Sequence, residues 1–269
     1  ITGTSKENNV TINAEKDQTA NVTLSGVNID VRDKGKAAVS TTGEGNVSIE
    51  LNGGSTLRSG YEHAGLEKNN GGSLTIADED KNGKLTAWGG QQGAGIGGGS
   101  GKDGSNIFIT GGGVNAIGGL AASGIGGGLG GNGSNITISG GKVGATNGLN
   151  GAGIGGGGSY GTDGAEVEPD ICALNPGGKI EYYAPRSSMS GTPNKTVTNP
   201  TGDFVWDSGT VTTPATCTEK GVRTYTCTSS SHTKTEDIPA LNHSFDGQEY
   251  VSDNNATCEQ DGTKTAKCV

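Results

Sequence analysis

The pentapeptide Gly-Ile-Gly-Gly-Gly occurs three times at equal spacing, and this repeat constrains the fold more than any other feature. The copies begin at Gly95, Gly124 and Gly153, each 29 residues after the last. Alternating aliphatic segments follow the same step, including Ile107-Phe108-Ile109 and Ile136-Thr137-Ile138. A fixed period of this length is typical of stacked units that cannot bury their apolar faces alone. Two-residue alternation indicates strands. The sequence therefore predicts an all-β, right-handed parallel β-helix with one coil per period.

Three strands are expected in each coil, and each should contribute one ladder of inward aliphatic side chains. Side chains alternate along a strand, so the outer residues of an aliphatic triplet face inward and the middle one faces outward. We expect strand-to-strand steps of 25, 27, 33 and 29 residues along the first ladder. The 33-residue step contains an insertion loop at 78–83. The triplets of the first ladder should begin at Val10, Val22, Val47, Leu74, Ile107 and Ile136. The second should contain Ile29, Leu57, Leu85, Val114 and Val143, and the third Val39, Leu66, Ile96, Ile125 and Ile154.

The composition excludes several classes of protein. With 53 glycines and 29% hydrophobic residues, the chain is too poor in apolar residues for an ordinary two-layer globule. A disordered low-complexity chain would fit these numbers, but the strict period favours a solenoid. The net charge is −9 without a basic stripe, so we expect no nucleic-acid partner. No apolar run approaches a membrane span, so we expect no membrane insertion in this fragment. The acidic balance, with abundant Thr, Ser and Asn, favours an extracellular, cell-surface or cell-wall location.

A second repeat with a 41-residue step follows near the C-terminus. Phe204, Cys217, Gly221 and Cys227 recur 41 residues later, and each unit is expected to form a β-hairpin. The turn of the first hairpin is expected at 219–221. We therefore divide the chain into a β-helix (1–166), a cap or linker (167–203), a small cysteine-containing β module (204–244) and an incomplete second module (245–269). A strand at 179–183 is expected to close the open end of the solenoid.

Two stretches resemble known families. Gly-Ala-Gly-Ile-Gly-Gly-Gly (151–157) and Asn-Ile-Thr-Ile-Ser-Gly-Gly (135–141) resemble Gly-rich β-helix repeats in large surface proteins of anaerobic Gram-positive bacteria. Residues 215–245 resemble small tandem modules of surface proteins from the same bacteria. Those modules carry Cys-x-x-Cys where this chain has Cys227-Thr228-Ser229-Ser230. The resemblance implies a cell-surface, adhesin-like or carbohydrate-binding protein.

The cysteines of the modules are candidates for disulfide bonds, because small exported domains use such cross-links. Free thiols are one alternative. A zinc site with His243 is another, although Ser230 removes a fourth ligand from it. Cys172 would remain unpaired. The expected pairs are Cys217 with Cys227 and Cys258 with Cys268.

Exposed aromatic side chains are candidate sugar-binding platforms, because a sugar ring can stack on an aromatic face. Tyr61, Trp88 and Tyr160 flank Gly-rich turns, and Phe108 faces outward by alternation. The alternative is that these rings shield the core at its loops. Trp88 is the best single candidate. On the platform hypothesis, Trp88→Ala should abolish glycan binding and leave the melting temperature nearly unchanged.

One acidic cluster, Asp78, Glu79 and Asp80, lies on the insertion loop and is either a solvated turn or a calcium site. No other cofactor is expected. Enzymes that cleave polysaccharides on a β-helix need clustered carboxylates or basic residues on one sheet face. The outward strand positions here are mainly Thr, Ser and Asn, which disfavours catalysis.

The preferred hypothesis is a non-enzymatic surface or adhesion module that binds a glycan or a cell-surface protein. A polysaccharide lyase or glycoside hydrolase is the first alternative. A structural spacer or filament subunit that self-associates through the solenoid ends is the second.

Overall fold

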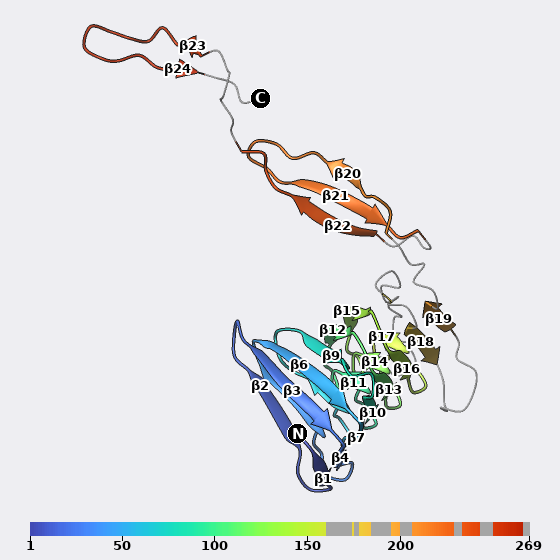
Figure 1. Ribbon diagram of the computed structural model, residues 1–269. Coiled ribbons are helices and arrows are strands. Elements are labelled where there is room, and N and C mark those ends of the chain that lie inside the picture. The colour runs from blue at the N-terminus through green and yellow to red at the C-terminus, as the bar shows by residue number, and fades with distance from the viewer. Residues whose placement is uncertain are drawn as a thin grey trace. The chain divides into compact units, whose positions relative to one another are not determined.

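The computed structural model describes residues 1–159, 174, 178–183, 195–199, 206–228, 233–242 and 250–265. The chain forms two compact units, residues 1–204 and 205–269. The first is the β-solenoid that the sequence predicts, with about five turns, and the second contains small antiparallel sheets (Figure 1). The predicted solenoid boundary at residue 166 lies outside the described residues.

Each coil of the solenoid contributes one strand in turn to three sheets, which we call A, B and C. Neighbours within a sheet are parallel, except β18 and β19. Sheet A contains β1 (Gly3–Ser5), β4 (Val27–Asp30), β7 (Gly54–Arg58), β10 (Lys84–Trp88), β13 (Gly113–Ile117), β16 (Lys142–Thr146), β18 (Gly178–Tyr183) and β19 (Lys195–Asn199). Sheet B contains β2 (Val10–Ala14), β5 (Val39–Gly43), β8 (Leu66–Lys68), β11 (Ile96–Gly97), β14 (Ile125–Gly126) and β17 (Ile154–Gly155). Sheet C contains β3 (Thr19–Ser25), β6 (Asn46–Asn52), β9 (Leu74–Ala77), β12 (Gly104–Ile109) and β15 (Gly133–Ile138).

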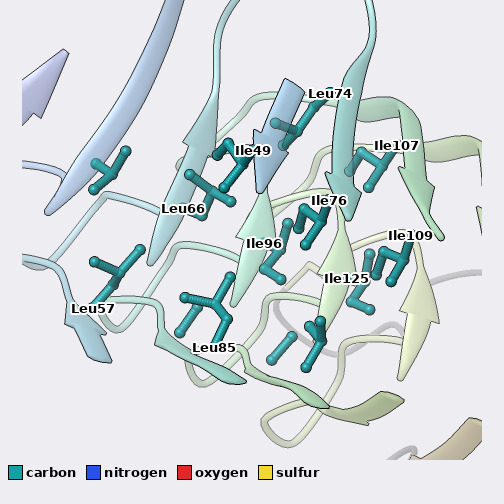
Figure 2. Close-up of a cluster of buried hydrophobic side chains, with 14 of the residues drawn as sticks. Ile49, Leu57, Leu66, Leu74, Ile76, Leu85, Ile96, Ile107, Ile109 and Ile125 are labelled. Carbon is teal, nitrogen blue, oxygen red and sulfur yellow. The ribbon is translucent and has the colours of Figure 1, made fainter. Parts of the chain in front are cut away.

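The core is a narrow column of aliphatic side chains that all three sheets enclose. Figure 2 shows leucines and isoleucines from the three sheets pointing toward one another inside the coils. The predicted third ladder is confirmed, because its members are buried and paired in register along sheet B. Those members are Val39, Leu66, Ile96, Ile125 and Ile154.

The predicted register of the other two ladders is wrong in the early coils. In sheet C, Val22 lies opposite Ile49 instead of Val47, so the first step is 27 residues. In sheet A, Leu57 lies opposite Ala87 instead of Leu85. The triplet at Val10 belongs to sheet B, where Val10 pairs with Val39. A shift by two residues keeps every side chain on its original face, so alternation alone cannot detect it.

The predicted strand at 179–183 is present as β18, and it extends the stack beyond the last complete coil. It pairs in parallel with β16, and Lys142 lies opposite Lys179. Ile180 and Leu174 are buried and belong to the solenoid core. An antiparallel strand, β19, then follows β18 in sheet A.

The second unit contains β20 (Thr210–Thr213), β21 (Gly221–Thr226) and β22 (Thr233–Ile238), which form an antiparallel sheet. A separate hairpin contains β23 (Val251–Ser252) and β24 (Lys264–Thr265). The 41-residue repeat is visible in the pairing, since Thr210 lies opposite Thr224 and Val251 lies opposite Thr265. The first hairpin turns through a longer loop than expected, residues 214–220.

Candidate functional site: a groove at one corner of the solenoid

A groove lies where the chain passes from sheet C to sheet A, and its shape follows from unequal turn lengths. One coil makes this passage through the inserted loop at 78–83. The next two coils make it through short glycine turns that include Gly111, Gly112, Gly140 and Gly141. The longer loop stands beside the shorter turns and leaves a hollow of about 860 Å³. Most of its lining residues are glycine, lysine, Asp78 and Asn82.

The glycine turns are required by the backbone geometry. Gly112 and Gly141 have φ angles of 88° and 82°, which side chains rarely allow. A Cβ at Gly112 would lie 2.9 Å from Leu51 Cδ1, and one at Gly141 would lie 2.3 Å from the carbonyl oxygen of Gly112. Each turn is also tied to a sheet A strand of the next coil, because Gly112 accepts a backbone hydrogen bond from Lys142 and Gly141 accepts one from Lys179. The floor of the groove therefore carries few side chains.

The loop that forms the wall is held to itself and to the preceding coil. Asp78 Oδ1 accepts a hydrogen bond from the amide of Asn82 at 3.1 Å. Asn82 Oδ1 accepts one from the amide of Gly53 at 3.0 Å, and Glu50 Oε1 accepts one from the amide of Glu79 at 2.7 Å. These hydrogen bonds give the wall a defined position.

A row of lysines borders the groove along the first residues of the sheet A strands. Lys84 lies opposite Gly113, Gly113 opposite Lys142, and Lys142 opposite Lys179. A second hollow of about 350 Å³ shares Gly113 and Lys142 with the groove and continues over the outer face of sheet A toward Glu181. Sequence reasoning missed this row, although the 29-residue step that aligns the core also aligns Lys84, Gly113 and Lys142.

Trp88, the preferred aromatic candidate, lies at the end of β10 on the outer face of sheet A and is half-buried. The guanidinium of Arg58 lies over its ring, 4.2 Å from the centroid. Arg58 and Ile117 are its register neighbours in the adjacent strands. Arg58 thus covers one face of the ring, which favours the alternative that Trp88 shields the sheet.

We now expect Trp88→Ala to destabilise the solenoid. Loss of the cation–π contact and of the half-buried ring should cost about 1–3 kcal/mol. A thermal melt followed by circular dichroism measures this change. Thr86→Ala, which alters an outward side chain of the same strand, is the control and should leave the melting temperature within about 2 °C. An unchanged melting temperature for Trp88→Ala would contradict the shielding role.

The other predicted aromatic candidates do not gather around one site. Tyr61 is exposed on the loop after β7, and its hydroxyl accepts a hydrogen bond from Gln92 Nε2 at 3.3 Å. Phe108 lies half-buried on the outer face of sheet C, between Thr75 and Thr137. Tyr160 lies outside the described residues.

The predicted calcium cluster is not assembled in the structure. Asp78 uses a carboxylate oxygen to hold its own loop, and it alone of Asp78, Glu79 and Asp80 lines the groove. Within the described ranges, no group of three or more His, Cys, Asp or Glu residues is arranged to hold a metal ion.

Sequence reasoning also missed a buried polar cluster on sheet B. Glu67 is 7% exposed, and its carboxylate contacts His63 Nδ1 and Asn69 Nδ2, each at 2.8 Å. Lys68 donates a hydrogen bond to the carbonyl of Asn70 at 2.8 Å, and burial lowers the pKa of Lys68. The sequence signal was the polar run at positions 67–70, where later coils have glycine. These polar groups thus find their partners within the same coil, which gives the cluster a structural role.

The cysteines of the second unit differ from the predicted pairing. Cys217 and Cys227 are both disulfide-bonded, which also excludes the zinc alternative, and Cys258 is free and exposed. Cys217 lies in the loop before Gly221, whereas Cys227 follows the far end of β21. Six strand residues span about 20 Å, but disulfide-bonded cysteines have Cα atoms within about 7 Å. Cys217 and Cys227 are therefore not bonded to each other.

We expect peptide mapping to show the same separation. Trypsin cleaves after Arg223, which lies between Cys217 and Cys227. Mass spectrometry of a non-reduced digest should find each cysteine cross-linked, but no peptide joining the two. The reduced digest is the control. A Cys217–Cys227 linked peptide would show that the strand register of this sheet is wrong.

Among the described residues, no helix has the length and hydrophobicity to span a membrane. No family model, curated protein or solved structure matches this chain.

Proposed function

We propose that the solenoid is a non-enzymatic glycan-binding module of an extracellular surface protein, and that the groove at the corner of sheets A and C holds the glycan. The observation that carries this proposal is the groove itself. Its volume of about 860 Å³ falls within the range of about 300–1,000 Å³ typical of ligand sites. Its lining offers the polar side chains of Asp78, Asn82, Thr110 and three lysines beside backbone groups of the glycine turns, which suits a ligand rich in hydroxyl groups.

Two further points support a glycan. The groove runs across three successive coils, through Lys84, Gly113 and Lys142 and their turns, so it offers an extended track to a linear chain. Backbone groups and lysines supply hydrogen-bond partners along that track, whereas aromatic platforms do not line it. We therefore expect weak binding at each site, strengthened by multivalency at a surface. The resemblance to bacterial surface proteins favours the same function and an adhesin-like role.

A glycan array combined with a blocking variant tests the proposal. Gly113 lines both hollows, and a Cβ there would meet only the flexible side chain of Lys84 at 3.3 Å, apart from a backbone oxygen at 3.8 Å. Gly113→Tyr should therefore fill the groove without unfolding the protein, and weaken binding about tenfold or more. Gly54→Tyr is the matched control, because Gly54 shares the same register row, has open space around it and lies outside the groove lining.

Three results would contradict the proposal. If no glycan on the array binds, the hypothesis that the protein is a structural spacer would be favoured. Equal weakening by Gly113→Tyr and Gly54→Tyr would place the site away from the groove. Release of reducing sugars or unsaturated products from a bound glycan would show that the protein is an enzyme.

A further inference from the structure

The lysines beside the groove form a local basic patch on an acidic protein. The two hollows are lined by Lys81, Lys84, Lys142 and Lys179, and by two carboxylates, Asp78 and Glu181. Four cations against two anions give a local charge of +2, while the whole chain has a net charge of −9. The side chains that line the two hollows are therefore net basic, whereas the chain as a whole is acidic.

The spacing of these lysines is set by the coil stack. Lys84 and Lys142 occupy the same register position two coils apart, which corresponds to about 10 Å. Lys142 and Lys179 are direct register neighbours, but Lys179 is already paired with Glu181. Lys84 and Lys142 are exposed, and neither has an ion-pair partner among the residues that the structure describes. They present two separated positive charges along the groove, with the side-chain-free Gly113 between them.

We propose that the groove recognises an acidic polysaccharide, one that carries sugar carboxylates. This inference rests on the proposed glycan-binding function and specifies its ligand class. Lys84 and Lys142 bind the carboxylates of two sugar units, and the unit between them lies over Gly113. Asp78 and Glu181 at the edges disfavour a polymer with densely spaced charges, because each would repel an additional anion. A chain with carboxylates at intervals satisfies both lysines and avoids both acidic side chains.

Calorimetric titration of the full chain tests the inference with three probes, polygalacturonate, alginate and hyaluronate, each beside its carboxyl-reduced form. The reduced polymers keep their linkages and lose their charge, so they isolate the contribution of the carboxylates. Hyaluronate, in which every second sugar carries a carboxylate, should bind most tightly, and its reduced form should bind about tenfold more weakly. Polygalacturonate and alginate, which carry a carboxylate on every sugar, should bind less tightly because Asp78 and Glu181 repel the additional anions. The affinity should fall as salt rises from low to physiological concentration, because exposed ion pairs are screened.

The Lys84→Gln/Lys142→Gln double variant should lose about tenfold in affinity for the carboxylated polymer and most of the salt dependence. Lys16→Gln, which removes an exposed lysine outside both hollows, should change neither. Equal binding of carboxylated and reduced polymers, blocked by Gly113→Tyr, would overturn the acidic ligand and leave the glycan-binding function standing. Unchanged binding by the double variant, or no binding of any carboxylated polymer, would also overturn the inference. The absence of all glycan binding, including on the array, would overturn both proposals.

Discussion

Replacing Ile125 with aspartate is expected to unfold the solenoid. Ile125 is completely buried, with Ile96 and Ile154 as its neighbours in sheet B. An aspartate there would place an unpaired carboxylate in a column of aliphatic side chains. Such substitutions cost about 4 kcal/mol or more, a large part of the stability of a typical domain. Circular dichroism at 25 °C should show loss of the strand signal or a melting temperature lowered by more than about 10 °C.

Two control variants identify the cause of this loss. Thr137→Asp adds the same charge on the outer face of sheet C, where Thr137 is half-buried and the carboxylate can remain hydrated. It should cost less than about 1 kcal/mol. Ile125→Val removes one methylene group without adding a charge, and should cost about 0.5–1.5 kcal/mol. If Thr137→Asp were as damaging as Ile125→Asp, the assignment of inner and outer faces would be wrong.

Replacing Gly126 with alanine is expected to have the second largest effect. Gly126 has a φ angle of 131°, and a Cβ there would lie 2.0 Å from the carbonyl oxygen of Gly155 in the next coil. A Cβ at Gly97 would likewise lie 2.1 Å from the carbonyl oxygen of Gly126. No flexible side chain can move aside, because the obstructing atom belongs to the backbone. The coils must separate locally, and we expect a loss of about 3 kcal/mol or more.

Gly130→Ala is the control for a glycine that has a positive φ angle but no close neighbour. Gly130 also has a positive φ angle, 71°, but no atom lies within 4 Å of its Cβ position. Alanine should cost only about 1 kcal/mol there. Chemical denaturation of the two variants measures the difference. Equal losses would mean that the close approach of the coils adds nothing to the cost of a side chain at Gly126.

The sequence predicted the strand pairing correctly where only one register buries the apolar side chains. Strands of sheet B are short and carry one aliphatic residue before glycine, as at Ile96 and Ile125, so their register was correct. In sheet C, β3 and β6 each carry three alternating apolar residues, and two pairings bury them equally well. The register between β3 and β6, and so the residue opposite Ile49, therefore depends on the lengths of the turns, which the alternation does not reveal.

The candidate site was less predictable, because it depends on how loops return to the stack. The insertion at 78–83 was recognised, but its position beside the glycine turns of the next two coils is a three-dimensional property. The contact between Arg58 and Trp88 was hidden for a similar reason. Their sequence separation of 30 residues differs from the 29-residue period, because turn lengths vary between coils. Sequence analysis therefore identified residues in the wall of the groove but missed the lysines at its rim.

The identical register of β10, β13 and β16 has a genetic consequence. These strands pair residue for residue at a constant separation of 29 positions, from Lys84 through Thr146. Deleting or duplicating 29 codons in this interval would give each strand a new neighbour of the same kind, and the core would remain closed. An error of one codon within a strand would reverse the inward and outward faces of the residues after it. A deletion or duplication that preserves these strand pairs therefore has to comprise whole coils, whereas loops such as 78–83 can vary in length.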